Sequence, residues 1–461
     1  MPNIVSVEDA VNSRNIPPGS RLYVSGNAAT PQLLLKQLAA DSSIRNIDFY
    51  GVLFLANEEV ENQIAIHSLF SPAVCERITH RIIFNSLYTR EAVNQGKAKY
   101  QLWHLSQVPD ILRREVKPNV VFFQVSGPDG GSNYSLGTTV ESVLPAIETA
   151  KENGGIVIAE RNQKMPFVLG TTVPESSIDF IVNADYRLPL SPVTKPDEAA
   201  TRIGEIIADL YIEDGSTLQY GIGEVPEAVT DAIIRKGVRD LGIHTELFAD
   251  AMRKLVEKGI VTNKKDKKEG ERFSVSSIFL AGSQEGYDWL DFNSSVQSRP
   301  SDYTNNLSVI ARQPNMVSIN SAIGIDLNGN IWADSLEAWQ IYSGIGGQSD
   351  FIRGTLLGRG KAIIALKATT KDGISKIFDK HPEGITTTGI AADPIIIVTE
   401  HGAFNPIGLS VGEKAVGIAF LAGPTERRSQ LLKRIYDHPA FHKPQEAISH
   451  GCPRGFIPYE K

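Results

Sequence analysis

The stretch GIHTELFAD, from Gly242 to Asp250, places Glu246 between a short apolar segment and a predicted helix. A carboxylate in that position has three distinct chemical uses. It can stabilise the start of a helix, bind a metal ion, or attack an electrophile as a nucleophile. The residues around Glu246 have to distinguish between these uses.

A glycine-containing loop precedes Glu246 in the chain. In STLQYGIGEVPEAVTDAIIRKG (residues 216–237), TLQY is predicted to be a strand, Gly221-Ile222-Gly223 a turn, and PEAVTDAIIRKG a helix that stops at Gly237. A strand, a tight glycine turn and a helix N-terminus together present free backbone N–H groups, which bind anions. A plain turn is the alternative interpretation. Pro226, at the third glycine position, excludes the dinucleotide pattern G-x-G-x-x-G.

The spacing between the loop and Glu246 accommodates one helix and one short strand. A parallel β-α-β crossover would bring Gly223 and Glu246 to the carboxyl ends of adjacent strands, the edge at which open α/β sheets bind ligands. There Glu246 would be a carboxylate nucleophile beside N–H groups that stabilise an oxyanion. On spacing alone, the role as a helix-start charge stays open.

Other catalytic arrangements are poorly supported. His244 and Glu246 could share one face of a strand, but no third ligand follows at a useful spacing, so no metal site is predicted. The G-x-S-x-G turn of a serine nucleophile does not occur in the sequence.

The elements that must position these residues follow an α/β pattern. Apolar runs of strand length alternate with amphipathic helical segments, as expected for parallel sheets covered on both faces. The predicted buried strands are NVVFFQVS (119–126), GIVIAE (155–160), KAIIALK (361–367) and PIIIVTE (394–400). The predicted helices include TVESVLPAIETAKENGG (139–155), DEAATRIGEIIADLYIEDGS (197–216), with Leu210 on its apolar face, and ELFADAMRKLVEKG (246–259).

The length of 461 residues predicts two domains. Three prolines in YRLPLSPVTKPDEAA (186–200) indicate an extended connector. We therefore expect an N-terminal domain at 1–190 and a C-terminal domain at 191–461. The last stretch, from residue 438, shows no sustained period and is expected to drape over the surface.

Composition excludes several classes of function. A net charge of −7 argues against a nucleic-acid surface, and NKKDKKEGER (263–272) mixes both signs as a solvated loop does. Two cysteines, Cys75 and Cys452, cannot form a disulfide framework. The sequence has neither the pattern of a signal peptide nor an apolar run of the roughly 18 to 20 residues that crosses a bilayer. A cytoplasmic protein without a membrane partner is expected.

Several long motifs, in order, resemble one family. GIGEVPEAV, LGIHTELFADAMRKLVEKGIVTN, VSINSAIGIDLNGNIWADS and SGIGGQSDFIRG are similar to segments of the acetyl-CoA hydrolase/transferase family, the class I CoA-transferases. The branch of 4-hydroxybutyrate and butyryl-CoA:acetate CoA-transferases looks most similar. In the N-terminal half, VSGPDGGSNYSLGTTVE and ERNQKMPFVLGTTVPESSIDFIV match the family's loops.

The resemblance implies two similar open α/β domains of the NagB/RpiA-like CoA-transferase fold, with the active site between them. It implies a ping-pong reaction through a glutamyl anhydride and a glutamyl-CoA thioester, with no permanently bound cofactor and with coenzyme A or acyl-CoA as substrate. By position, Glu246 falls on the family's nucleophile. The remaining site residues implied are Gly221, Ile222, Gly223, Glu224, Val225, Gly346 and Gly347 at CoA and the oxyanion, and Gln219, Asn320 and Ser321 as positioning residues. A homodimer or larger homo-oligomer is also implied.

Alternatives stay open at this point. Transfer between a short-chain acyl-CoA and a free carboxylate, with acetate on one side, is the main expectation. An acyl-CoA hydrolase using the same glutamate and a non-catalytic ligand-sensing module are the others. His401 and the segment before it (386–402) depart from the family pattern, so 4-hydroxybutyrate is not carried over as the substrate. Lys367 and Lys371 are either contacts for the CoA phosphates or surface lysines without such a role.

Overall fold

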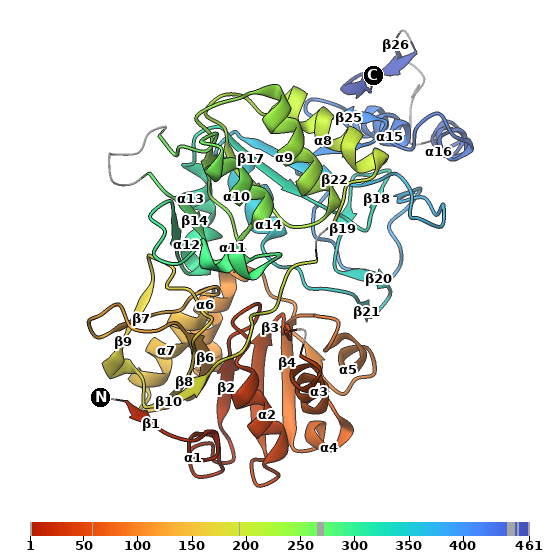
Figure 1. The fold of residues 1–461 in the computed structure, drawn as a ribbon. Coiled ribbons are helices and arrows are strands. Elements are labelled where there is room, and N and C mark those ends of the chain that lie inside the picture. Colours follow the sequence, from red (N-terminus) through yellow and green to blue (C-terminus); the bar gives the residue numbers. More distant parts are fainter. Residues whose placement is uncertain are drawn as a thin grey trace.

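Two β-sheets organise the chain, one in each half of the sequence (Figure 1). The computed structural model describes residues 2–57, 59–192, 194–264, 272–439, 448–449 and 451–459. Most of the charged run at 263–272, namely residues 265–271, lies outside this description. No helix in the described part of the chain combines the length and the apolar character needed to cross a membrane.

The N-terminal sheet has eight strands, and every neighbouring pair in it is parallel. In spatial order they are β1 (Asn3–Ile4), β10 (Phe180–Ala184), β8 (Ile156–Asn162), β6 (Val120–Val125), β2 (Arg21–Val24), β3 (Ile47–Val52), β4 (Ile78–Phe84) and β5 (Lys99–Tyr100). Apolar side chains of α2 and α3 pack on one face, and those of α7 pack on the other. The helices of this half are α1 (Val7–Ala10), α2 (Gln32–Ala40), α3 (Val60–Leu69), α4 (Pro72–Cys75), α5 (Arg90–Asn94), α6 (Val108–Ile111) and α7 (Val143–Glu152).

The C-terminal sheet has seven strands, of which the first five in spatial order are parallel. They are β12 (Gly242–Ile243), β11 (Thr217–Tyr220), β17 (Met316–Asn320), β22 (Lys361–Ala365), β24 (Ile396–Thr399), β25 (Gly402–Phe404) and β28 (Phe456–Pro458). The helices of this half are α8 (Glu198–Tyr211), α9 (Glu224–Lys236), α10 (Asp250–Glu257), α11 (Gln284–Asp288), α12 (Ser301–Thr304), α13 (Leu307–Ala311), α14 (Gln348–Leu357), α15 (Val411–Phe420) and α16 (Glu426–Tyr436).

Side chains from α8, α9 and α10 bury one face of this sheet, and side chains from α14, α15 and α16 bury the other. Short strand pairs complete the structure. They are β13 (Leu247–Ala249) with β15 (Ile278–Leu280), β14 (Ser274–Ser276) with β16 (Val296–Ser298), β18 (Gly324–Asp326) with β19 (Ile331–Trp332) and β23 (Ile377–Phe378), β20 (Ser335–Glu337) with β21 (Gln340–Ile341), β7 (Asn133–Ser135) with β9 (Thr172–Pro174), and β26 (Ile448–Ser449) with β27 (Cys452–Pro453).

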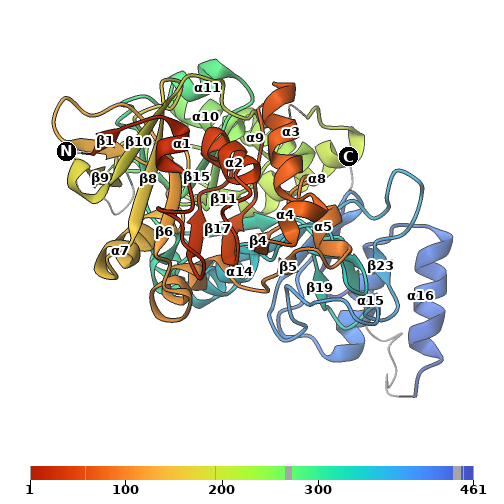
Figure 2. The ribbon, with the colours of Figure 1, turned by 90° about the horizontal axis from the view of Figure 1, so that it is seen from below.

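The two halves meet along a backbone pairing. Residues 138–141 of the N-terminal half run beside residues 277–279, with an antiparallel bridge between Thr139 and Ile278. The Phe279 N–H donates to the Thr138 carbonyl at 2.8 Å, and the Val140 N–H donates to the Ser277 carbonyl at 2.9 Å. Figure 2 shows the ribbon from below, with helices and strands of the N-terminal half in front. The division between domains at residue 190 stays a prediction.

Three expectations about local structure are wrong. The helix after Glu246 begins at Asp250, because residues 247–249 form β13 and pair with β15. Asp250 is therefore the acidic residue at the start of this helix, and Glu246 does not have the role of a helix-start charge. Leu210 is exposed on α8, not on its apolar face. In the described part of the C-terminal stretch, β28 extends the second sheet beside β25 and does not only drape over the surface, while residues 440–447, 450, 460 and 461 lie outside the description.

Candidate active site

The loop of Gly221 to Val225 lies at the carboxyl end of β11, as the sequence predicts. Strand β11 lies between β12 and β17 and is buried along its length. Gly223 has φ +117°, a conformation that favours glycine, and α9 begins at the next residue. Gly237 ends α9 in the left-handed conformation, again as predicted.

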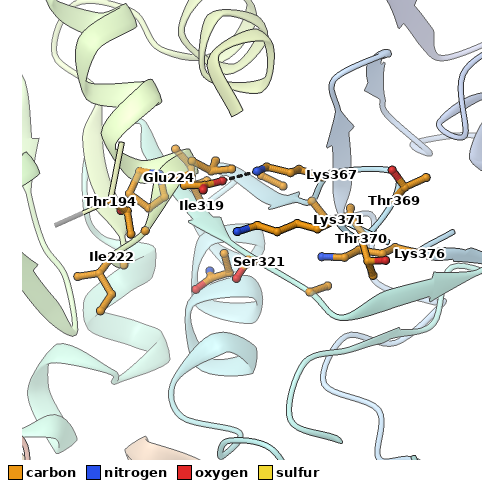
Figure 3. Close-up of a pocket in the computed structure, with 18 of the residues that line it drawn as sticks. Thr194, Ile222, Glu224, Ile319, Ser321, Lys367, Thr369, Thr370, Lys371 and Lys376 are labelled. Atoms are coloured by element: carbon orange, nitrogen blue, oxygen red, sulfur yellow. Dashed lines mark hydrogen bonds and ion pairs between the residues drawn. The ribbon is translucent and has the colours of Figure 1, made fainter. Parts of the chain in front are cut away.

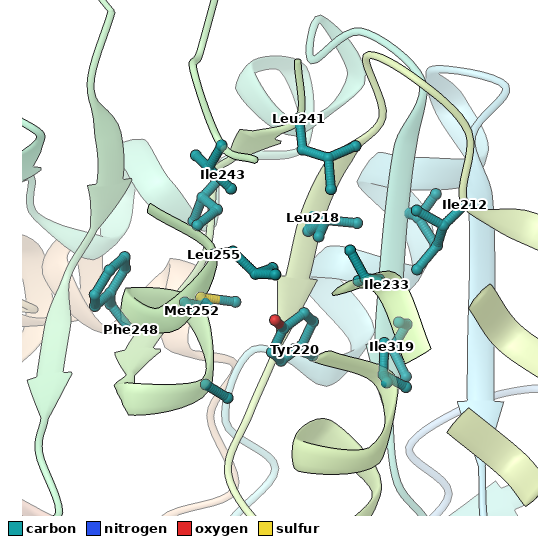
Figure 4. Close-up of a cluster of buried hydrophobic side chains, with 14 of the residues drawn as sticks. Ile212, Leu218, Tyr220, Ile233, Leu241, Ile243, Phe248, Met252, Leu255 and Ile319 are labelled. Carbon is teal, nitrogen blue, oxygen red and sulfur yellow. The ribbon is translucent and has the colours of Figure 1, made fainter. Parts of the chain in front are cut away.

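A hydrophobic cluster holds the strand and the helix together (Figure 4). Leu218 and Tyr220 of β11 pack with Ile233 of α9 and Leu255 of α10, and all four side chains are buried. Burial of each such side chain stabilises the fold by about 1.5–3 kcal/mol. The Tyr220 and Thr230 hydroxyls add a hydrogen bond at 2.8 Å. This packing fixes the positions of β11 and α9, and therefore of the Gly221–Val225 loop between them.

Glu246 follows the neighbouring strand β12, which is parallel to β11. Its carbonyl oxygen accepts hydrogen bonds from the Ser277 and Ile278 N–H groups at 3.2 and 2.9 Å. The hydroxyls of Ser276 and Ser277 donate to the same oxygen at 2.9 and 3.0 Å. The predicted placement of Glu246 and the glycine loop at adjacent strand ends is present in the structure, and the backbone at Glu246 is firmly held.

The Glu246 carboxylate is partly buried and has few partners. Asn305 Nδ2 donates to Oε2 at 2.7 Å, and the Gly347 N–H also donates to the carboxylate. Burial raises the pKa of Glu246 to about 7, and the charge of Asp350 also raises it, whereas the two hydrogen bonds lower it. This carboxyl is therefore readily ionised near neutral pH but poorly solvated, which suits a nucleophile.

Gly346 and Gly347 lie directly against the carboxylate. A Cβ atom on Gly347 would be 1.9 Å from Glu246 Oε2, and one on Gly346 would be 3.6 Å from Oε1. The N-terminal half supports this loop, because the Leu105 N–H donates to the Gly346 carbonyl at 3.1 Å. The close approach of backbone N–H groups to the glutamate requires glycine here.

Asp350 forms a second acidic group behind the glycines. The Ser106 N–H and hydroxyl donate to its two oxygens at 3.0 and 2.7 Å, and Asn305 also donates to this carboxylate. Burial raises the pKa of Asp350, while the Ser106 hydrogen bonds lower it. Asn305 therefore lies between two carboxylates, and only one of them, Glu246, follows a strand end beside the glycine loop.

Gln219 and Asn320 pair on adjacent strands β11 and β17. Their side-chain amides exchange two hydrogen bonds at 3.2 and 3.1 Å. The carbonyl of Ser321 accepts from Gln348 Nε2 at 2.7 Å, which joins this strand end to the Gly346-Gly347 loop. All three residues lie at the predicted edge of the sheet.

A cavity of about 720 Å³ opens along the glycine loop (Figure 3). Its walls include the Gly221–Val225 loop, Asn320 and Ser321, and three lysines, Lys367, Lys371 and Lys376. Lys367 forms ion pairs with Glu224 and, at 2.6 Å, with Asp197. Burial lowers the pKa of the Lys376 ammonium group. Both predicted lysines border the cavity, but Lys367 is neutralised by protein carboxylates.

Several site residues were not predicted individually. Asp350 lies inside the quoted motif SGIGGQSDFIRG without being singled out, and Lys376 follows the predicted lysines closely. Asn305 stands in TNNLSVI, which carries no recognisable pattern. Ser106 and Asn305 become neighbours of the site only through tertiary contacts, so spacing offered no signal for them.

Comparison with known proteins gives matches over both halves of the chain. Residues 3–190 match the model of the acetyl-CoA hydrolase/transferase N-terminal domain, and residues 282–435 match that of the C-terminal domain. The chain is 38% identical to the 4-hydroxybutyrate coenzyme A transferase of Clostridium kluyveri over 354 residues, 76% of this chain and 80% of that protein.

Two further proteins match over most of their length. The succinyl-CoA:acetate/propanoyl-CoA:succinate CoA transferase of Fasciola hepatica is 33% identical over 436 residues, 91% of this chain and 85% of that protein. The crystal structure of RipA from Yersinia pestis has a TM-score of 0.83 and 31% identity, covering 94% of this chain and 97% of that one. The α/β fold predicted from the sequence is therefore confirmed.

Proposed function

The chain belongs to the acetyl-CoA hydrolase/transferase family and is a CoA-transferase, and we propose that Glu246 is the nucleophile of a ping-pong exchange. The exchange moves CoA from a short-chain acyl-CoA to a free carboxylate, with acetate on one side. A homo-oligomeric state and a cytoplasmic location stay predictions.

One observation carries this proposal. The Glu246 carboxylate is held by Asn305 Nδ2 at 2.7 Å and covered by the backbone of Gly346 and Gly347, and Phe84 of the N-terminal half lies against Gly346. A carboxylate whose pKa burial raises to about 7 is a stronger nucleophile than a solvated one, and it is still ionised in a useful fraction at neutral pH.

In the first half-reaction, a Glu246 carboxylate oxygen attacks the thioester carbonyl, and the C–S bond breaks. The products are a glutamyl–acyl anhydride and the CoA thiolate. The thiolate then attacks the glutamyl carbonyl, and the bond between that carbonyl carbon and the bridging oxygen breaks. The first carboxylate leaves, and Glu246 carries CoA as a thioester.

In the second half-reaction, the new carboxylate attacks the glutamyl-CoA thioester, and the same steps run in reverse. Each intermediate is an activated acyl group, so the free energy of the thioester is kept for the product. A serine in place of Glu246 would form an ordinary ester and trap the acyl group. Each attack places negative charge on an oxygen, and backbone N–H groups of the glycine loops are suitable donors. Loss of one such donor typically costs about 3 to 4 kcal/mol.

We place CoA in the cavity beside the Gly221–Val225 loop. The free N–H groups at the start of α9 and the ammonium groups of Lys371 and Lys376 offer positive potential to phosphates. Lys367 is a weaker candidate because Glu224 and Asp197 already pair with it. From this cavity the thioester end would reach Glu246 past Ser321 and Gln348, which connect the two loops.

The test is an exchange assay with purified protein. A panel of acyl-CoAs is incubated with and without carboxylate acceptors, and the CoA products are separated chromatographically. Acyl exchange that requires the acceptor supports the proposal. Release of free CoA without an acceptor supports an acyl-CoA hydrolase instead, and binding without turnover supports a sensor.

The matched variants are Glu246→Ala and Glu257→Ala. Glu257 is an exposed glutamate of α10 that pairs only with Arg253 among the residues described. Exchange should be lost in Glu246→Ala and unchanged in Glu257→Ala. Full exchange in Glu246→Ala would exclude the proposed nucleophile.

A further inference from the structure

Glu141 is a buried acid at the junction of the two halves. It lies in the segment 138–141 that pairs with residues 277–279, and its side chain is fully buried. Its φ of +33° is unusual for a residue with a side chain, so the surrounding contacts must hold it in place. Neither the strands of the fold nor the steps of the exchange account for an acid in this position.

Glu141 contacts both supports of Glu246 through its backbone. Its N–H donates to the Ser277 carbonyl at 3.4 Å, and the N–H and hydroxyl of Ser277 hold the Glu246 carbonyl. Its carbonyl accepts from the Ser301 N–H at 2.9 Å, and the Ser301 carbonyl accepts from the Asn305 N–H at 3.0 Å. One residue of the N-terminal half thus steadies both the backbone and the carboxylate partner of Glu246.

The Glu141 side chain has little to stabilise a negative charge. Its Oε2 accepts from the Tyr23 hydroxyl at 3.3 Å, and its Oε1 is buried without a hydrogen-bond partner in the described structure. The ionisable groups that act on it are Glu246 and Tyr23, and neither is a cation. Burial and the charge of Glu246 raise the pKa of Glu141 to about 8, while the Tyr23 hydroxyl lowers it.

We propose that Glu141 is a positioning residue for the exchange reaction, and that its carboxyl must stay uncharged for a carboxylate substrate to enter. The inference rests on the proposed role of Glu246. During the second half-reaction Glu246 is esterified to CoA and neutral, and the incoming carboxylate brings a negative charge close to Glu141. A neutral Glu141 exerts no repulsion on the incoming carboxylate. An ionised Glu141 repels it, and the repulsion is strong because little water is present to screen the two charges.

The resulting signature is a pH-dependent KM for the carboxylate. In the glutamyl-CoA form the charge of Glu246, which helps to raise the pKa of Glu141 to about 8, is absent, so Glu141 ionises below that value. Once Glu141 ionises, the KM of the natural protein should rise by about tenfold per pH unit. The KM for acyl-CoA and the value of kcat at saturating carboxylate should change far less. If Glu141 had a structural role alone, its ionisation would not change the KM for the carboxylate selectively.

The experiment compares Glu141→Gln with Glu148→Gln from about pH 6 to about pH 9.5. Glu148 is an exposed glutamate of α7, seven residues farther along the chain, and serves as the control. In Glu141→Gln, the neutral amide should abolish the rise in KM for the carboxylate, and in Glu148→Gln the rise should remain. The inference is overturned if the rise in KM persists in Glu141→Gln while the melting temperature of this variant equals that of the natural protein.

Tyr23→Phe tests the same point without touching the acid. Removal of the hydroxyl takes away the group that lowers the pKa of Glu141, so the rise in KM should move to higher pH. A shift to lower pH, or no shift, contradicts the inference and decides the matter if Glu141→Gln does not fold. Exchange that survives in Glu246→Ala would sink the proposed function itself, which is a separate outcome.

Discussion

Asn305 Nδ2 lies 2.7 Å from Glu246 Oε2 and also donates to the carboxylate of Asp350. The Thr304 hydroxyl donates to Asn305 Oδ1 at 2.8 Å, which fixes the orientation of the amide. The amide therefore presents its N–H₂ group to both acids. A neutral donor in this place stabilises the ionised form of Glu246 and leaves its negative charge available. A lysine or arginine would instead neutralise that charge in an ion pair.

Replacement of Asn305 by alanine should weaken catalysis by about 10- to 100-fold, because a hydrogen bond to a charged group contributes about 1.5–3 kcal/mol. The acid limb of the pH–rate profile should also move to higher pH, since this hydrogen bond lowers the pKa of Glu246. The control is Asn306→Ala, which removes the side-chain cap of α13. It should lower the melting temperature and leave the acid limb in place. An unmoved limb in Asn305→Ala would contradict the assigned contact.

Replacement of Gly347 by alanine should abolish exchange. The new Cβ atom would be 1.9 Å from Glu246 Oε2 and 2.0 Å from Asn305 Nδ2, so both groups would have to move. Gly127→Ala is the control, because a Cβ atom there meets open space. Steady-state exchange rates of the two variants check the prediction, and near-natural activity in Gly347→Ala would exclude this geometry.

The pH dependence of kcat/KM for acyl-CoA should show an acid limb near pH 7. Burial raises the pKa of Glu246 to about 7, and only the ionised form attacks, so activity should rise with pH through this value. Initial rates in buffers of constant ionic strength measure the limb. A limb near the ordinary glutamate value of about 4.5 would mean that the carboxyl is solvated.

Stability should change with pH in the opposite direction. The folded-state pKa of Glu246 lies above its unfolded value, so its contribution is present below about pH 4.5 and is lost as the pH rises through about 7. The loss for Glu246 is on the order of 3 kcal/mol. Urea unfolding at several pH values should show a smaller decrease in Glu246→Gln than in the natural protein. Equal decreases would contradict the raised pKa.

Removal of the cavity lysines should weaken the binding of acyl-CoA. Lys371→Ala and Lys376→Ala are each expected to raise the KM for acyl-CoA by about 5- to 10-fold, or about 1 kcal/mol. The effect should shrink at high salt, because the salt screens the attraction of ammonium groups for phosphates. Lys36→Ala, on the N-terminal helix α2, should have no effect. Unchanged KM values in both cavity variants would place the CoA phosphates elsewhere.

The strand, loop and helix that carry the glycines could be predicted because their signals are local. The strand TLQY, the Gly221–Gly223 turn and the stop at Gly237 were all predicted from neighbouring residues, and the structure follows them. The placement of Glu246 beside this loop followed from the same local argument, because a parallel crossover of this length leaves few alternatives.

The parts that could not be predicted depend on contacts between distant segments. Residues 247–249 have a helical pattern but form β13, because pairing with β15 overrides the local preference. Asn305 and Glu141 reach the site only where the two halves of the chain meet, through Ser301 and Ser277. No spacing rule in a single sequence indicates such a junction.

The most direct measurement concerns covalent labelling of Glu246. The protein is incubated with acyl-CoA, treated with borohydride, digested, and its peptides are identified by mass spectrometry. We expect Glu246 to be reduced to an alcohol only after acyl-CoA is added, since borohydride attacks a glutamyl-CoA thioester and not a free carboxylate. Reduction at another acidic residue, or none during active exchange, would contradict Glu246 as the nucleophile.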